Sequence, residues 1–254
     1  MYKTAITLGK REEAEEFAMR REKLNKLIHQ TFYHEDEGIY STGSQLDMCY
    51  PMLVGVVPDS LYNKVKENVV TMTEEKHKGH IAVGLVGVPI LTEWAVRNKQ
   101  VDFFYQMMKK RDYPGYLYMI DHGATATWEY WSGERSRVHN CYNGIGTWFY
   151  QAVGGIRLDE ANPGYRHFYV DPQTPNGVTW VKVTKESPYG TIAVNWELQG
   201  KQLNLQLTVP AGTTATVCIP NNAVSCKKNK KKVSVKEQTV DVEAGHYDFL
   251  FNLK

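Results

Sequence analysis

A carboxylate stands among aromatic side chains in residues 121–131, which read Asp-His-Gly-Ala-Thr-Ala-Thr-Trp-Glu-Tyr-Trp. Glu129 lies beside Trp128, Tyr130 and Trp131. Aromatic faces stack on the C–H groups of sugar rings, and a carboxylate beside them can transfer a proton. An aromatic-rich turn that packs into a core and carries a surface glutamate has the same local pattern. The segment therefore predicts either a sugar-processing site or a packed turn.

Other segments surround this one in a definite order. Residues 112–120 read Asp-Tyr-Pro-Gly-Tyr-Leu-Tyr-Met-Ile, residues 136–140 read Ser-Arg-Val-His-Asn, and residues 144–150 read Gly-Ile-Gly-Thr-Trp-Phe-Tyr. This order resembles the C-terminal portion of the catalytic domain of bacterial α-L-rhamnosidases, glycoside hydrolase family 78. In that family a tyrosine-proline segment precedes a Gly-Ala-Thr-Thr-x-Trp-Glu-x-Trp motif, and a histidine-containing segment precedes Gly-x-Trp-Phe-Tyr. Residues 163–168, Pro-Gly-Tyr-Arg-His-Phe, also resemble the entry into the family's C-terminal sandwich.

The resemblance implies part of an (α/α)6 barrel, the six-hairpin glycosidase domain, over residues 1–154. It implies an antiparallel β-sandwich over residues 155–254, and inverting hydrolysis of terminal α-L-rhamnosides. Glu129 matches the family's general base, and His139 matches its rhamnose-contacting histidine. We expect Trp128, Trp131 and Tyr118 to contact the substrate as well.

The resemblance is incomplete in two places. Residues 140–143, Asn-Cys-Tyr-Asn, stand where many relatives have another aromatic-rich run. Nothing in residues 1–110 matches the acidic, tryptophan-containing segment that holds the family's general acid. Since an inverting glycosidase needs two carboxyl groups about 6.5–9.5 Å apart, half of the pair is missing. We therefore expect a C-terminal part of such an enzyme, completed by a missing N-terminal half or prone to self-association.

Two other classes of function remain open. In the first, the chain is a non-catalytic carbohydrate-binding or structural remnant that holds a sugar without breaking a bond. In the second, it is another six-hairpin glycosidase, a phosphorylase or a lyase. A phosphorylase needs a cationic phosphate site beside Glu129 and a lyase needs a clamp for a uronate, for which Arg135 and Arg137 are the nearby candidates.

The charge and hydropathy of the 254-residue chain argue against several partners. The net charge of +2 gives no general field for nucleic acid or an anionic membrane. No apolar run approaches the roughly 20 residues that span a bilayer, and the N-terminus lacks the pattern of a signal peptide. We expect a small carbohydrate as the partner, whether the parent enzyme is cytoplasmic or exported.

The cysteines and histidines do not indicate a metal site or a cofactor. Cys49, Cys141, Cys218 and Cys226 lack Cys-x-x-Cys spacing, although the last two are close enough to pair across a hairpin. His77 and His80 lie near each other without thiolate or carboxylate partners at ligand spacing. We expect neither a metal nor an organic cofactor.

The first half of the chain has the periodicity of helices, and the second half has the periodicity of strands. Apolar residues between Ala14 and Ile28 follow helical spacing, and further helices are predicted at 45–56, 60–76, 84–97, 100–111 and 143–153. The long loop 111–137 carries Glu129. After residue 156, apolar residues alternate at 192–198 and 203–209 around a turn at Gly200-Lys201, which predicts a β-hairpin with one buried face. The lysine-rich segment 227–232 is interpreted as a solvated hairpin tip.

Overall fold

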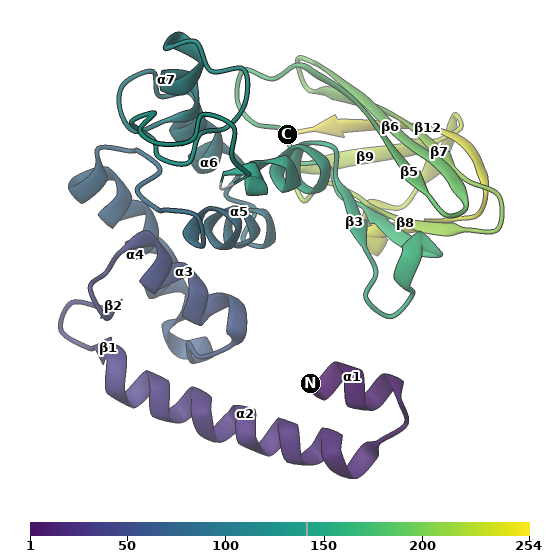
Figure 1. Cartoon of the computed structure of the whole chain (residues 1–254). Helices are drawn as coiled ribbons and strands as arrows, with labels where there is room; N and C mark the ends of the chain where they lie inside the picture. Colours follow the sequence, from purple (N-terminus) through teal and green to yellow (C-terminus); the bar gives the residue numbers. More distant parts are fainter. Residues whose placement is uncertain (141) are drawn as a thin grey trace. The chain divides into compact units, whose positions relative to one another are not determined.

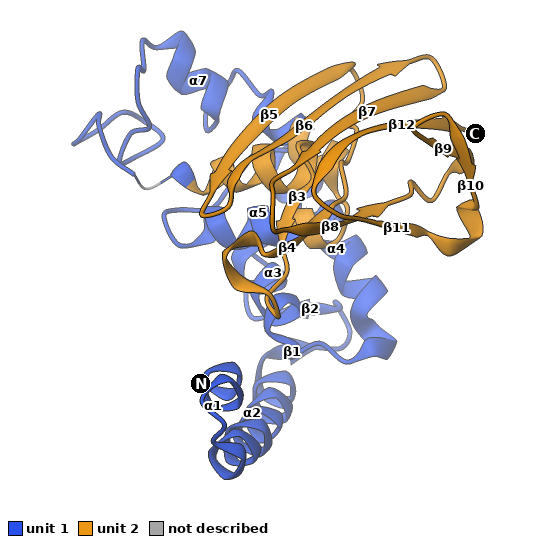
Figure 2. Ribbon diagram, turned by 90° about the vertical axis from the view of Figure 1, so that its right-hand side faces the viewer, with its two compact units in different colours: residues 1–94, 106–143 blue, residues 95–105, 144–254 orange. Residues whose placement is uncertain are grey.

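The computed structural model describes residues 1–140 and 142–254, with helices in the first part and strands in the second (Figure 1). The chain forms two compact units, shown in Figure 2. Unit 1 contains residues 1–94 and 106–143, and unit 2 contains residues 95–105 and 144–254. These units are defined by compactness, whereas the boundary expected after residue 154 separates two domains, and this boundary stays a prediction.

The helices follow the apolar periodicity of the sequence. They are α1 (Tyr2–Thr7), α2 (Arg11–Phe32), α3 (Gln45–Val54), α4 (Asp59–His77), α5 (Gly87–Arg97), α6 (Val101–Met108) and α7 (Tyr116–Asp121). A short hairpin of β1 (Tyr33–His34) and β2 (Ile39–Tyr40) joins α2 to α3. The six-residue α7 lies inside the segment predicted to be a loop, where its length is too short for a periodic signal. The helix expected at 143–153 is a 3-10 turn (Asn143–Ile145) followed by a π-helical turn (Trp148–Val153).

Local signals explain where α3 begins and ends and where α4 begins. The Ser44 hydroxyl accepts a hydrogen bond from the backbone N–H of Asp47 at 3.1 Å and caps α3. Gly55 ends α3 with φ of 77°, a conformation that glycine adopts without a steric penalty. Pro58 directly precedes the first residue of α4, where its missing N–H costs no hydrogen bond within the helix.

Buried side chains of unit 1 connect α3, α4 and the segment that follows α4. The Gln45 side-chain amide donates to the Thr73 hydroxyl at 3.0 Å and to the His80 carbonyl at 2.9 Å. Its oxygen accepts from the Ala82 N–H at 2.8 Å. The Trp94 indole N–H donates to the Met52 sulfur at 3.0 Å. These bonds join residues that are far apart in the sequence.

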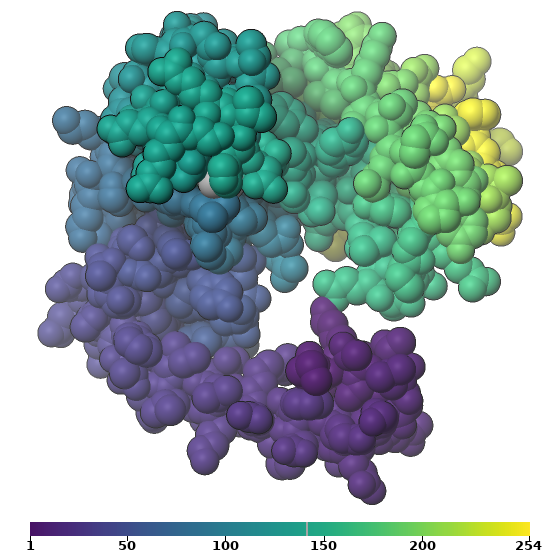
Figure 3. All heavy atoms as spheres, viewed as in Figure 1, coloured from purple at the N-terminus to yellow at the C-terminus, as the bar shows by residue number. Residues whose placement is uncertain are grey.

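Helix α2 buries less of its apolar face than its periodicity predicts. Ala14 is buried, but Leu24 and Leu27 are 46% and 55% exposed. In the space-filling view, α1 and α2 form a purple arm of unit 1 (Figure 3). The Asn25 amide anchors the C-terminal half of α2 by donating to the Gly55 carbonyl at 2.9 Å.

Unit 2 contains two sheets that pack their apolar faces together. The four-stranded sheet has the order β11-β8-β4-β3, with a parallel pair between β4 and β8, and the six-stranded sheet has the antiparallel order β10-β9-β12-β7-β6-β5. The strands are β3 (Ile156–Leu158), β4 (His167–Val170), β5 (Trp180–Ser187), β6 (Gly190–Gln199), β7 (Gln202–Val209), β8 (Thr214–Cys218), β9 (Ala223–Lys228), β10 (Lys231–Val233), β11 (Thr239–Val242) and β12 (Gly245–Leu253). Short 3-10 turns occupy Pro163–Tyr165 and Val235–Glu237.

The hairpin predicted around Gly200-Lys201 is confirmed. Gln199 pairs with Gln202, and Gly200 has a φ of 59°, as a tight hairpin turn requires. The side chains of alternating residues face the core, where Val194, Trp196 and Leu205 are buried. The lysine-rich segment also forms a hairpin tip, since β9 ends at Lys228 and β10 begins at Lys231.

Three cysteines are free thiols in the described chain, and their positions exclude the pairing considered from the sequence. Cys218 lies at the end of β8 in the four-stranded sheet, whereas Cys226 lies on β9 in the six-stranded sheet. Cys49 is buried in α3, where loss of hydration raises the pKa of its thiol. Cys141 lies outside the described residues.

Candidate active site

The segment that contains Glu129 folds back on itself as an irregular hairpin. The backbone N–H of Glu129 donates to the Ser136 carbonyl at 2.8 Å, and the N–H of His139 donates to the Thr127 carbonyl at 2.8 Å. Gly133 supplies the turn with a φ of 78°, and a Cβ atom there would lie 2.7 Å from the Trp128 ring. The small residue is therefore required both by the turn and by its close contact with the indole. This hairpin places Glu129 and His139 on its two arms.

The Glu129 carboxylate is held by a peptide N–H and a nearby guanidinium. Its Oε2 accepts from the Ser136 N–H at 3.3 Å, and its Oε1 lies 3.8 Å from Arg135 Nη1. The Arg135 guanidinium also lies over the Tyr130 ring, 5.3 Å from the centroid. The Glu129 side chain is 26% exposed, so water reaches the carboxylate. A fixed carboxylate that contacts water is able to act as a general base.

The two tryptophans beside Glu129 pack inside unit 1. Trp128 is 2% exposed, and the Arg137 guanidinium lies 5.2 Å from its ring centroid. Trp131 donates from Nε1 to the Val83 carbonyl at 3.0 Å and stacks on Tyr142 with centroids 3.9 Å apart. Contact between Trp128 and a sugar would require this loop to open. Sugar contacts for both tryptophans stay predictions, while their packing fixes the backbone on either side of Glu129.

The other two expected substrate residues are partly exposed. Tyr118 lies on α7, where its ring packs edge to face with the Tyr113 ring, 5.5 Å between centroids, and against the His122 ring, 4.0 Å between centroids. His139 lies on the second arm of the Glu129 hairpin. The hairpin therefore brings together Glu129 and His139, and Tyr118 belongs to the helix that precedes this hairpin.

A buried histidine anchors the beginning of the same loop. His80 Nδ1 lies 2.8 Å from the Pro114 carbonyl, and its Nε2 lies 3.2 Å from Asp112 Oδ2. Hydrogen bonding from the backbone N–H of Asp112 and the charge of the His80 ring lower the pKa of the Asp112 carboxyl. This network joins residues more than 30 positions apart, so their spacing in the sequence gives no signal of it.

Across residues 1–140 and 142–254, no three His, Cys, Asp or Glu side chains gather in a group that could hold a metal ion. No helix in the described part of the chain is both long and apolar enough to cross a membrane.

Family models match both parts of the chain. The model of the bacterial alpha-L-rhamnosidase six-hairpin glycosidase domain matches residues 1–153, and the model of the bacterial alpha-L-rhamnosidase C-terminal domain matches residues 155–234. A curated alpha-L-rhamnosidase from Formosa agariphila is 29% identical over 97% of this chain and 29% of its own length. Another from Alteromonas sp. is 26% identical over 97% of this chain and 28% of its own length.

Solved structures have the same fold. The alpha-L-rhamnosidase of Dictyoglumus thermophilum superposes with a TM-score of 0.90 at 21% identity, over 99% of this chain and 30% of that one. The Streptomyces avermitilis alpha-L-rhamnosidase, solved with L-rhamnose, gives 0.88 at 24% identity, over 98% and 25%. The present chain thus spans less than a third of the length of these relatives. The expected fold class, part of an (α/α)6 barrel followed by a β-sandwich, is confirmed. Because the six-hairpin model alone matches residues 1–153 of 254, the chain belongs to the family of bacterial α-L-rhamnosidases.

Proposed function

We propose that this chain carries the general base of an inverting glycoside hydrolase that acts on terminal α-L-rhamnosides. The observation that carries the proposal is the partly exposed Glu129 carboxylate, fixed by the Ser136 N–H and Arg135 in a segment that the six-hairpin model covers. Relatives named alpha-L-rhamnosidases, one of them solved with L-rhamnose, support the substrate class. We also propose a six-hairpin domain over residues 1–154 and a C-terminal sandwich domain over residues 155–254.

The proposed reaction needs two carboxyl groups with different tasks. Glu129 takes a proton from a water molecule as this water attacks the anomeric carbon. A second carboxyl group, on the opposite side of the sugar, protonates the departing glycosidic oxygen. The Ser136 N–H and the Arg135 guanidinium orient the Glu129 carboxylate, and His139 hydrogen-bonds a hydroxyl of the sugar. We propose that residues outside this chain supply the general acid.

Substitution of Glu129 tests this role. Glu129→Gln keeps the size of the side chain and removes the base, so turnover of an activated aryl α-L-rhamnoside should fall by about 10²–10⁴, while L-rhamnose binding persists. Phenol release by the 254-residue chain, and by any longer protein that contains it, measures turnover. Glu134→Gln is the matched control, since Glu134 is an exposed glutamate of the same loop. Near-normal turnover of Glu129→Gln would remove Glu129 from the mechanism.

The position of Arg135 favours a phosphorylase as the second candidate function. Its guanidinium lies 3.8 Å from Glu129, where a phosphorylase needs a cation for inorganic phosphate. The product distinguishes the two reactions. Hydrolysis releases free rhamnose at a rate independent of phosphate, whereas phosphorolysis releases a sugar phosphate and requires phosphate.

A further inference from the structure

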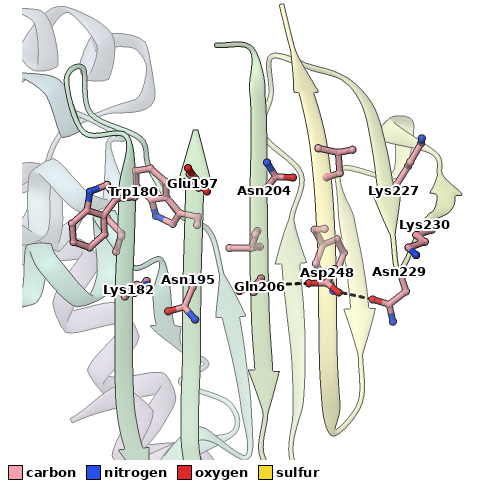
Figure 4. A pocket seen from close by; sticks show the side chains of 15 residues that line it. Trp180, Lys182, Asn195, Glu197, Asn204, Gln206, Lys227, Asn229, Lys230 and Asp248 are labelled. Carbon is pink, nitrogen blue, oxygen red and sulfur yellow. Dashed lines mark hydrogen bonds between the residues drawn. The ribbon is translucent and has the colours of Figure 1, made fainter. Parts of the chain in front are cut away.

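The outer face of the six-stranded sheet in unit 2 contains a groove of about 910 Å³. This volume lies in the range of small-molecule binding sites. The groove crosses strands β5, β6, β7, β12 and β9, and Figure 4 shows polar side chains rising from each of them. All of its lining residues lie between 180 and 250, so none belongs to the Glu129 loop.

Strand register arranges the lining side chains in two rows across the sheet. In the first row, Lys182 lies opposite Asn195, Asn195 opposite Gln206, and Gln206 opposite Asp248. The Asp248 N–H donates to Asn229 Oδ1 at 2.8 Å and extends this row to the end of β9. Since neighbouring strands lie about 4.8 Å apart, the row is about 19 Å long.

The second row lies two residues further along each strand. Trp180 is opposite Glu197, Glu197 is opposite Asn204, and Leu250 lies between Asn204 and Lys227. With a rise of about 3.4 Å per residue, the two rows are about 7 Å apart. The groove is thus a long, shallow strip that suits an extended chain better than a compact molecule.

The side-chain amides at the centre of this strip have donors and acceptors that the protein leaves mostly unused. In the described structure, the side chains of Asn195 and Asn204 make no hydrogen bond with the protein, although both are half-buried in the groove. The Gln206 amide makes only a long bond of 3.4 Å, to Asp248. Each amide both donates and accepts, which matches a hydroxyl group that also does both.

An exposed indole stands at one end of the second row. Trp180 lies on edge strand β5 and is 62% exposed, although it is the largest apolar side chain of this face. The face of an indole carries partial negative charge, which attracts the C–H groups on one side of a sugar ring. A ring stacked on Trp180 would direct its hydroxyls toward Glu197, the neighbour of Trp180 in the same row, and a second sugar would reach Asn204 on the next strand.

The same face fits other classes of partner poorly. Protein interface cores are depleted of charged side chains, whereas Lys182, Glu197 and Asp248 are spread across this groove. The groove is lined by the carboxylates Glu197 and Asp248 as well as by three lysines, Lys182, Lys227 and Lys230, so a chain with an anionic group on every unit meets repulsion along with attraction. A neutral chain rich in hydroxyls meets neither obstacle.

We propose that this groove binds a neutral oligosaccharide, with one sugar on Trp180 and its neighbours along the two polar rows. The site is separate from Glu129 and does not depend on the rhamnosidase activity. Its ligand is a glycan of several sugars, because a single sugar contacts only one part of a strip about 19 Å long.

Titration calorimetry on the full 254-residue chain tests the proposal. The probes are three neutral hexasaccharides, from rhamnan, xylan and cellulose, together with the monosaccharide of each and hexagalacturonate. At least one neutral hexasaccharide should bind with Kd below about 1 mM, and its monosaccharide should bind at least about tenfold more weakly. Trp180→Ala should weaken hexasaccharide binding about tenfold, and Asn204→Ala should weaken it severalfold.

Matched variants and rival outcomes make the test decisive. Tyr189→Ala removes an exposed aromatic ring outside the groove and should leave the affinity unchanged. The proposal is overturned if no neutral hexasaccharide binds at concentrations up to about 10 mM. It is also overturned if the Trp180→Ala variant binds the hexasaccharide as tightly as the parent chain does. It is also overturned if hexagalacturonate binds best and Lys182→Ala or Lys227→Ala abolishes its binding. Self-association through this face, abolished by Trp180→Ala without any sugar binding, would identify a second copy as the occupant. Loss of activity in Glu129→Gln with groove binding intact would separate this site from the catalytic proposal.

Discussion

The two arms of the hairpin around Glu129 carry different side chains, Glu129 on the first arm and His139 on the second. On the first arm, Glu129 makes two hydrogen bonds with the Ser136 backbone, one through its own N–H and one through its carboxylate. Together they fix the Glu129 carboxylate. On the second arm, the His139 backbone N–H donates to the Thr127 carbonyl, a bond that fixes the main chain and that an alanine at this position would keep. A sugar-contacting role for His139 can therefore be tested apart from the fold.

Replacement of His139 should affect sugar binding more than stability. His139→Ala removes a proposed hydrogen bond to a rhamnose hydroxyl, so L-rhamnose binding should weaken by about 1–3 kcal/mol. Calorimetry measures the affinity, and thermal unfolding measures the stability. His34→Ala is the control, because His34 is exposed on β1, far along the sequence from this loop. A His139 variant that unfolds more easily but keeps its affinity would show that this histidine belongs to the core.

The thiol of Cys218 provides a test of local electrostatics in unit 2. Burial, followed by the charge of Asp171, raises the pKa of Cys218 from 9.0 to about 11. Since the thiolate is the reactive form, alkylation by iodoacetamide at pH 8 should be about 100-fold slower than in the unfolded chain. The rate should rise about tenfold per pH unit until the pH approaches 11. Mass spectrometry of samples taken at timed intervals measures the alkylation rate of Cys218. Equal rates in the folded and unfolded chains would contradict the raised pKa.

At the scale of elements, one buried amide joins α3 to two other segments of unit 1. Gln45 is 2% exposed and bonds to Thr73, His80 and Ala82. Its removal leaves the His80 carbonyl and the Ala82 N–H buried without this partner. Such groups are expensive to leave unpaired in a protein interior. The packing of α3 against α4 therefore depends on a polar residue as well as on apolar side chains.

Gln45→Leu should lower the free energy of unfolding by about 2–4 kcal/mol, because the apolar side chain satisfies neither backbone group. Urea unfolding, followed by circular dichroism, measures the change. Gln30→Leu is the matched substitution at an exposed position of α2 and should change stability by less than about 0.5 kcal/mol. If Gln45→Leu were as stable as the parent, the network would contribute nothing net to the fold.

At the scale of the whole molecule, the proposed separation of base and acid sets the range of substrates. Without an acid, the leaving oxygen must depart unprotonated, which is hardest for natural glycosides and easiest for acidic phenols. The 254-residue chain should hydrolyse natural rhamnosides negligibly and an activated aryl rhamnoside at a trace rate. Product release from both substrates measures this, with Glu129→Gln as the background. Efficient cleavage of a natural rhamnoside would place an acid within the chain, with Glu37, Asp47 and Asp121 the first to replace.

The sequence by itself determined the features that depend on neighbouring residues. Alternation of apolar residues predicted the β6–β7 hairpin and its buried face, and helical spacing predicted α3 to α6, because these patterns are set by local backbone geometry. The ordered motifs around Glu129 identified the family.

Only the tertiary structure decided the features that join distant residues. The His80–Asp112 pair and the Gln45 bonds link positions about 30 apart, where sequence spacing has no geometric meaning. The sequence predicts that Trp128 contacts a sugar, whereas in the structure its ring is buried inside unit 1. The two polar rows of the groove arise from register between strands, which places Trp180 beside Glu197 and Glu197 beside Asn204, although each residue comes from a different strand. Long-range pairing determines which side chains meet, and the local pattern of each strand specifies only which side chains face outward.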